Sequence, residues 1–390
     1  MKFNVKTLYV YKFISQCLPI YAFYTILFIE RGKSVSDIAL LIALWSLFTI
    51  IFEIPSGVLA DRWNRRNMLA WSAVFQGLCF IIWFFSHTFF MFALGFIFWG
   101  ISGAFASGTE EGLIYDNLKS DGNEEKFTQI YGKARFYATI GTVFGIGSAG
   151  VIATFVAIEN IALISAAICF LNVIFALQIR EKNLYSEGID RNVSKFFDTF
   201  KEAGIFLKET KVAIVFIVFL ALFANIGGFL DEFDALIIND FGLSHIWVSV
   251  ILTVRFVFVA FGELVAPIVQ RRVSSVKTVF LFSMLACTFL TIFSVIWDWY
   301  AILFFGFSFM IMAINEILLV NALQNKIKEE GRATVMSFYG IALDMVMICF
   351  GLVYGLLAGL LPLQYVYLVI SIYGFVGGAI FYIGHKLRTI

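Results

Sequence analysis

Long apolar runs alternate with short polar segments along almost the whole chain. Twelve windows of about 20 mostly apolar residues can be delimited, the length that an α-helix needs to cross a bilayer. Apolar side chains occur all round these windows without a period of two, which predicts helices in lipid rather than barrel strands. The windows begin near Leu8, Ser36, Leu69, Phe89, Ile130, Asn160, Val212, Ser244, Thr278, Trp299, Ala333 and Leu363.

The long connection over residues 180–211 separates six windows from six. This division predicts an all-α integral membrane protein of twelve transmembrane helices in two pseudo-symmetric six-helix bundles, residues 1–179 and 212–390. Within the connection, apolar residues recur on one helical face among several lysines. That pattern fits an amphipathic helix on the anionic inner leaflet, and it fits a solvated charged linker equally well.

A faint internal repeat supports the two-bundle division. Shifting the sequence by 210 residues places Glu53 on Glu263, and shifting it by 205 places Glu111 on Glu316. Both shifts are close to half the chain and join matching topological positions. They favour duplicated halves, as in many transporter folds.

Composition and charge indicate that the chain lies in a membrane and predict on which side its termini lie. The chain is 61% hydrophobic and 14% charged, outside the range of soluble domains. With a net charge of +1 it offers no extended surface for nucleic acid. Of the 28 Lys and Arg residues, 24 fall on the side of the N-terminus and only Arg31 and Lys33 on the other. The positive-inside rule then predicts a multi-pass protein of the inner (plasma) membrane with both termini in the cytoplasm.

Enzyme chemistry finds little support in the sequence. The five cysteines fall in different windows without paired spacing, and the three histidines lie at window ends without metal-ligand spacing. A nucleotide-binding loop and a nucleophile motif are also absent from the sequence. We therefore expect no catalytic residues, no metal and no cofactor.

A charged turn between the second and third windows is the most informative motif. It has the form G-x-x-x-D-R-x-x-R-R, with Gly57, Asp61, Arg62, Arg65 and Arg66 at the defined positions. This turn resembles the signature loop of major facilitator superfamily transporters. The resemblance implies a gate that holds two bundles together on the cytoplasmic side in one conformation, with the glycine permitting close helix approach. Simple positive-inside anchoring is the alternative.

Two further segments extend the resemblance. Gly132, Gly141, Gly145 and Gly150 are similar to the antiporter motif of drug-exporting members, with Ile146 where that motif has proline. Small residues repeated along a helix also serve simple close packing, and the two explanations are equally good. The fourth window ends in S-G-T-E-E-G-L-I-Y-D, which looks like a bacterial branch distantly related to tetracycline-type exporters. It implies a transporter without naming the cargo.

Ionisable residues inside the bilayer cost about 2.5–3.5 kcal/mol each to insert, so each is a functional candidate. Three acids have no obvious cation nearby in sequence, Glu111, Glu316 and Asp344, and Glu110 is grouped with them. A carboxylate removed from water is harder to ionise and can load and release a proton near neutral pH. These acids are the proton-coupling candidates. A permanently neutral, hydrogen-bonded acid is the alternative.

The remaining polar residues divide into ion pairs and substrate contacts. We expect Arg135 to pair with Glu110, Glu111 or Asp116 on the neighbouring helix. Arg255 lies near the midplane as an anion-binding residue or as the counter-ion of Asp344, and the second role is favoured. Lys12 is expected to reach the inner surface. The candidate gate pairs are Glu53, Glu263, Arg135 and Asp116, and the candidate substrate contacts are Gln16, Asn225, Asp231, Asp234, Arg255 and Asn315.

These features predict a secondary active transporter working by alternating access, with proton-coupled export of small organic or drug-like compounds. An importer or facilitator of a polar or anionic nutrient is the alternative, and a non-transporting membrane receptor fits less well because the loops are short. The expected partners are a small-molecule substrate, a proton or another coupling ion, and the lipid bilayer, with the protein a monomer.

Overall fold

The computed structural model describes residues 4–181, 219, 222–223, 226–272, 276–324 and 332–388. The regular structure of these residues is helical, with no strand among them. Ten helical segments are long and apolar enough to cross a membrane: Val5–Glu30, Val35–Glu53, Arg65–Phe85, Phe89–Ser120, Ile158–Gln178, His245–Arg272, Lys277–Ile296, Trp299–Val320, Tyr339–Leu360 and Leu363–Ile383. An all-α multi-pass architecture is thereby confirmed.

The two other predicted spans differ from these ten. The fifth coincides with a helix at Phe127–Ile152, which is long enough to span but carries Lys133, Arg135 and five glycines that lower its mean hydropathy. The seventh begins at Val212, outside the described residues. The total of twelve spans and the cytoplasmic position of both termini stay predictions.

The chain divides into two compact units. Unit 1 comprises Met1–Val193 with Ser244–Val250, and unit 2 comprises Ser194–Leu243 with Ile251–Ile390. The proposed connection over residues 180–211 lies almost wholly outside the described residues, so the bundle boundaries at 179 and 212 also stay predictions.

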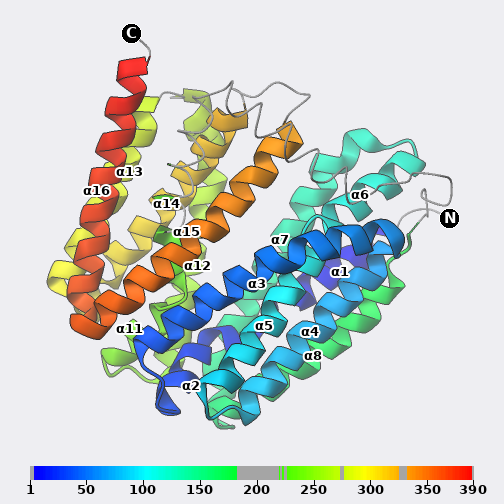
Figure 1. Cartoon of the computed structure of the whole chain (residues 1–390), viewed down its shortest axis with the longest axis horizontal. Coiled ribbons are helices and arrows are strands. Elements are labelled where there is room, and N and C mark those ends of the chain that lie inside the picture. The colour runs from blue at the N-terminus through cyan, green and yellow to red at the C-terminus, as the bar shows by residue number, and fades with distance from the viewer. Residues whose placement is uncertain are drawn as a thin grey trace. The chain divides into compact units, whose positions relative to one another are not determined.

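Unit 1 is built on four helices that pack in series. In Figure 1, α3, α5, α4 and α8 run alongside one another, with α3 against α5, α5 against α4 and α4 against α8. The first span packs against α7 and α8. The elements are α1 (Val5–Gln16), η1 (Pro19–Ala22), α2 (Tyr24–Glu30), α3 (Val35–Arg62), α4 (Arg65–Phe85), α5 (Phe89–Ala106), α6 (Thr109–Ser120), η2 (Glu124–Lys126), α7 (Phe127–Ile152) and α8 (Ile158–Gln178).

Local sequence explains where several of these helices begin. The Ser34 hydroxyl accepts the backbone N–H of Asp37, and the Asp37 carboxylate accepts the backbone N–H of Ser34, so a capping box starts α3. Between α5 and α6, Gly108 has φ +65°, a left-handed conformation that glycine adopts without strain. The fourth span therefore changes direction just before its acidic segment.

Unit 2 is organised around α13, which packs against both α14 and α16. Its helices are α11 (Asp234–Asp240), α12 (His245–Arg272), α13 (Val276–Ile296), η3 (Trp299–Ala301), α14 (Ile302–Gln324), α15 (Arg332–Leu360) and α16 (Leu363–Arg388). The first residues of α12, as far as Val250, group with unit 1.

Helix bounds repeat between the two units. The pair α2 and α3 has 7 and 28 residues, and the pair α11 and α12 has the same lengths at positions shifted by 210. Helices α4 and α13 both have 21 residues. The internal repeat inferred from the acidic residues is thus present in the helical framework.

Both units also contain a broken first span. In unit 1, Pro19 interrupts the helix between α1 and α2, and the backbone N–H of Ile20 donates to Ser165 Oγ at 3.1 Å. In unit 2, a turn at residues 232–233 separates helical residues 226–231 from α11. Broken spans are common at transporter binding sites because they expose polar groups at membrane depth.

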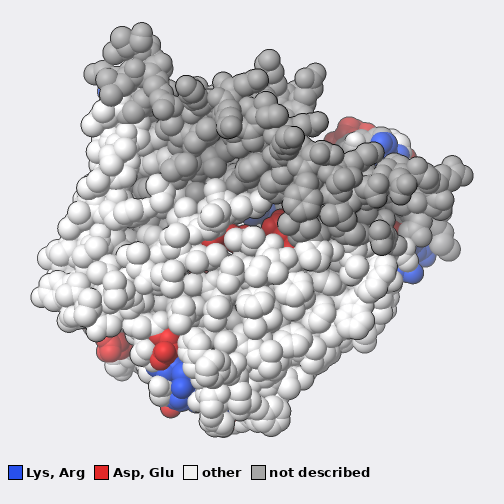
Figure 2. All heavy atoms as spheres, viewed as in Figure 1, with Lys and Arg blue, Asp and Glu red and all other residues white. Residues whose placement is uncertain are grey.

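The described surface suits a lipid environment. Large apolar side chains stand exposed on both units, with Phe90 and Phe155 at 82% and Leu264 at 74%. Figure 2 shows wide uncharged areas between small groups of charged side chains on the described part of one face. Exposure of such apolar areas to water would be unfavourable, whereas in a bilayer they contact the apolar chains of the lipids.

Candidate functional site

Unit 2 contains a buried charge cluster at its broken span. Arg255 of α12 forms ion pairs with Asp231 and Asp234, from Nη2 to Asp231 Oδ1 and, at 2.5 Å, from Nε to Asp234 Oδ2. The side chain of Arg255 is 6% exposed, that of Asp234 is 0% exposed and that of Asp231 is 36% exposed. One guanidinium therefore serves two carboxylates at the edge of the protein interior.

Aromatic side chains enclose this cluster. The guanidinium lies 4.0 Å from the ring centre of Phe256 and 4.8 Å from that of Phe309. The fully buried Tyr354 and Tyr367 lie within electrostatic range of Asp234. Rings exclude water and so strengthen the interactions between the charges that they surround.

The partner of Arg255 differs from the one favoured by the sequence, which was Asp344. Asp231 and Asp234 are three residues apart and flank the turn at residues 232–233, so both carboxylates reach the same guanidinium. Asp344 is half-buried on α15. The turn that brings the two aspartates together was not visible in the hydropathy pattern.

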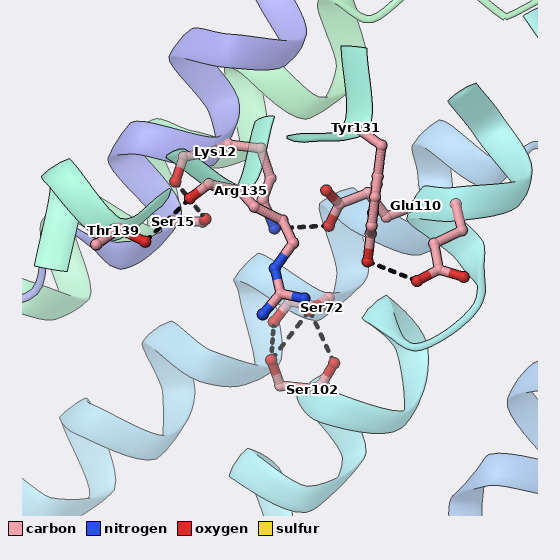
Figure 3. Close-up of polar contacts among 9 residues, drawn as sticks. Lys12, Ser15, Ser72, Ser102, Glu110, Tyr131, Arg135 and Thr139 are labelled. Atoms are coloured by element: carbon pink, nitrogen blue, oxygen red, sulfur yellow. Dashed lines mark hydrogen bonds and ion pairs between the residues drawn. The ribbon is translucent and has the colours of Figure 1, made fainter. Parts of the chain in front are cut away.

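Unit 1 holds a second, partly buried ion pair. Lys12 of α1 contacts Glu110 of α6 at 2.6 Å, with side chains only 15% and 14% exposed. Tyr131 of α7 donates its hydroxyl to Glu111 at 2.6 Å. Figure 3 shows Lys12 pointing toward Glu110, with Tyr131 on the other side of the carboxylate. Lys12 therefore points to an acid of the same unit, a pairing that was not predicted from the sequence.

The pairing expected for Arg135 also differs from the structure. Each of its three proposed partners contacts another residue: Lys12 for Glu110, Tyr131 for Glu111 and Arg65 for Asp116. Arg135 is exposed and forms no ion pair within the described ranges. Its side chain extends beside the Lys12–Glu110 pair in Figure 3.

The signature loop is tied to α6 and to the segment that follows α8 in unit 1. Arg65 Nη1 lies 3.1 Å from Asp116 Oδ2. The backbone N–H groups of Arg65 and Arg66 donate to the two oxygens of Glu181 at 2.8 and 3.1 Å. A carboxylate at this place stabilises the free N–H groups and the dipole of the α4 N-terminus. Glu181, just beyond α8, was missed because it lies far from the motif in sequence.

Gly112 makes this arrangement sterically possible. A Cβ on this residue would overlap the guanidinium of Arg65. Around Gly57, by contrast, no described atom lies within 4 Å of the place of a Cβ, so the close helix approach expected there is not seen. The side chains of Asp61 and Arg62 lie outside the described part of the structure.

The remaining candidates are dispersed. Glu53, Glu263 and Glu316 are exposed, and the first two form no ion pair with any described residue. Asn315 is buried and donates to Ser283 Oγ at 2.8 Å, a contact between helices. Gln16 is half-buried, and Asn225 lies outside the described residues.

Two glycines of the antiporter-like motif have a packing role. A Cβ on Gly141 would meet the backbone of Phe13, and one on Gly145 would meet the backbone of Cys17 and Leu18. Both glycines therefore let α7 approach the first span closely. Nothing described lies within 4 Å of the corresponding position on Gly132.

Comparison with known proteins identifies the family to which this architecture belongs. A sequence profile of the Major Facilitator Superfamily matches residues 13–351. Over 120 residues the chain is 28% identical to the tetracycline resistance protein, class H, of Pasteurella multocida. The matched segment covers 31% of this chain and 27% of that protein.

Two crystal structures have a similar fold over almost the whole chain. The nucleoside transporter NupG is 15% identical with a TM-score of 0.80, and the match covers 98% of this chain and 99% of that chain. A D-xylose-proton symporter is 12% identical with a TM-score of 0.74, over 97% and 95% of the two chains. At these identities the similarity is one of fold.

Proposed function

Since the chain belongs to the Major Facilitator Superfamily, we propose that it is a secondary active transporter that exports small organic compounds by alternating access, driven by protons. The family and the similar solved structures are transporters and not enzymes. We place the protein in the plasma membrane with both termini in the cytoplasm, on the grounds of its positive-inside charge distribution. We also propose that it acts as a monomer.

The charge balance of the unit 2 cluster is the observation that carries proton coupling. Arg255 supplies one positive charge, and Asp231 and Asp234 supply two negative charges when both are ionised. An uncompensated charge is expensive in this setting, since Asp234 is fully buried. A proton on either carboxylate restores neutrality and loosens that carboxylate's hold on Arg255.

Such a cluster links protonation to helix position. Arg255 lies within the 28-residue helix α12, whereas both aspartates belong to the broken span before it. Breaking one of the two ion pairs removes a tie between these segments. Loading and releasing a proton can thereby bias two conformations of unit 2, as alternating access requires.

In unit 1 we assign the inner gate to the signature loop. Arg65 is held by Asp116, and the α4 N-terminus is held by Glu181, so α4, α6 and the segment after α8 meet at one charged junction. The roles of Asp61 and Arg62 remain those that the family resemblance implies.

Export is supported by the resemblance to the tetracycline-type branch and by the similarity to a tetracycline resistance protein. Import of an anionic nutrient through Arg255 is the less favoured alternative. Its guanidinium is already engaged by two carboxylates and enclosed by rings, so an incoming anion would have to displace an aspartate.

Transport in everted vesicles tests the proposal. A thermal-shift screen of small organic compounds, with tetracycline, uridine and xylose among them, first identifies a compound that raises the Tm of the purified chain. We expect uptake of that compound into everted vesicles when the lumen is acidic. Asp234→Asn should abolish the dependence on the gradient, while Asp240→Asn, at the exposed end of the same helix α11, should preserve it. Uptake indifferent to the pH gradient would refute proton coupling.

A further inference from the structure

Unit 1 contains an aromatic cluster centred on Trp99 that the transport proposal does not yet use. The Tyr21 ring stacks on Trp99 with centroids 5.6 Å apart and an interplanar angle of 17°, and Trp45 lies 5.5 Å from Trp99. These three side chains are half-buried, so part of each ring is accessible. Beneath them lie the buried rings of Trp83 and Phe96, which hold Trp99 in place.

The accessible rings lie at a common depth in the unit. Trp45 and Trp99 each stand 10 residues after the first residue of their helices, α3 and α5, which corresponds to ~15 Å along each helix axis. Tyr21 belongs to the break in the first span. Residues from three spans thus meet about halfway along them, where transporter substrate sites occur.

Polar groups at the cluster argue against a simple lipid-facing patch. Gln76, near the middle of α4, is half-buried and donates from Nε2 to the hydroxyl of Tyr21 at 2.6 Å. The indole N–H of Trp45 is buried and has no hydrogen-bond partner among the described residues. An amide and an unpaired N–H are unfavourable against hydrocarbon, whereas they suit a site that takes a partly polar ligand.

Under the internal repeat, these positions are equivalent to those of the charge cluster in unit 2. The shift of 210 that superposes α2 and α3 on α11 and α12 also relates the two sets of residues. It places Tyr21, Tyr24, Trp45 and Trp99 on Asp231, Asp234, Arg255 and Phe309. Three of the four equivalent positions therefore carry a ring in unit 1 and an ion in unit 2, and the fourth carries a ring in both units.

We propose that Tyr21, Trp45 and Trp99, with Gln76 at their edge, form a binding surface for the planar aromatic or heteroaromatic ring of the transported compound. The proposal rests on the transport function and specifies the class of substrate. Offset and edge-to-face contacts of a ligand ring with these side chains supply attraction that a saturated ring does not receive. The Gln76 amide at their edge offers hydrogen bonds to a ring heteroatom or a hydroxyl substituent.

A matched pair of ligands tests the inference on the purified full chain. The probes are naphthalene-2-methanol and its saturated analogue decahydronaphthalene-2-methanol, with binding followed by saturation-transfer NMR. We expect about tenfold tighter binding of the aromatic compound, because at least two ring contacts distinguish the pair.

Single substitutions then locate the site. Trp45→Leu and Trp99→Leu should remove the preference for the aromatic probe, and Trp45→Phe should keep most of it. Trp71→Leu is the control, since Trp71 is 45% exposed on α4 and outside the cluster. Thermal unfolding of each variant separates loss of the site from loss of the fold, and Trp45→Phe supplies a folded variant that retains a ring.

Equal binding of the two probes by the native protein would overturn the inference. So would an undiminished preference in folded Trp45→Leu and Trp99→Leu. The result remains distinguishable from the fate of proton coupling, because Asp234→Asn should leave the preference intact. Vesicle transport insensitive to pH combined with a tenfold preference would refute coupling alone, and pH-driven transport without a preference would refute the aromatic site alone.

Discussion

The charge balance around Arg255 makes a graded prediction for three substitutions. Arg255→Leu removes the single cation and leaves Asp234, which is 0% exposed, without a counter-charge. Asp234→Asn leaves Arg255 paired with Asp231 and keeps a polar amide in the same volume. Asp231→Asn affects the most exposed member of the cluster, at 36%. The expected order of destabilisation is therefore Arg255→Leu, then Asp234→Asn, then Asp231→Asn.

Magnitudes follow from burial. Removing one partner of a buried ion pair costs about 3–5 kcal/mol, which applies to Arg255→Leu. Asp234→Asn loses a charged contact but strands no charge, so we expect about 1–3 kcal/mol. For Asp231→Asn, screening by solvent lowers the expected cost to about 1 kcal/mol or less. A gap of about 2 kcal/mol between the first two variants corresponds to roughly 30-fold in the unfolding equilibrium.

Denaturant unfolding in detergent, followed by far-UV circular dichroism, measures these differences. The double variant Arg255→Leu with Asp234→Asn provides the decisive control. It removes the stranded buried carboxylate, so it should be more stable than Arg255→Leu alone. If Asp234→Asn were as damaging as Arg255→Leu, or if the double variant were the least stable of all, the cluster would not be an over-acidic triad and the basis for proton coupling would fail.

Three further substitutions, each with a control or second-site variant, test unit 1. Gly112→Ala should displace the arginine guanidinium packed against it and lower the transport rate severalfold in the vesicle assay, whereas Gly132→Ala, in open space, should not. Gly141→Ala should destabilise the protein by about 1–3 kcal/mol through overlap with the neighbouring backbone. Gly132→Ala should be neutral or stabilising by up to about 1 kcal/mol. Thermal unfolding measures both variants, and equal effects would contradict a packing role for Gly141. Lys12→Met should cost about 3 kcal/mol by stranding a buried acid, and adding Glu110→Gln should recover part of that loss; no recovery would refute the pairing.

The membrane architecture was predictable because it depends on local quantities. A run of about 20 apolar residues commits a segment to a spanning helix whatever its neighbours. Ten of the predicted spans are found on this basis. The fifth, at Phe127–Ile152, shows the limit of the method, since glycines needed for close packing reduce the hydropathy that identifies a span.

Pairing of the charges was not predictable from spacing. Three acids of the neighbouring helix were expected to be partners of Arg135, yet one of them, Glu110, pairs with Lys12, 98 residues away. Gly108, with its left-handed φ, turns α6 away from the axis of α5 and redirects the acids that follow it. Partner choice between helices depends on such turns and on packing, which a hydropathy pattern does not contain.

The internal repeat separates what specifies the scaffold from what specifies its chemistry. Helix lengths and the break in the first span are preserved between α2–α3 and α11–α12, because they are set by apolar spacing and turn residues. The side chains at most of the equivalent sites differ in kind, with Trp45 in one unit and Arg255 in the other, whereas Trp99 and Phe309 are both aromatic. An arginine at position 45 would have no carboxylate from Tyr21 or Tyr24 to neutralise it. Each set is therefore self-consistent only as a whole, which fits our proposal that one half recognises an aromatic ring and the other moves charge.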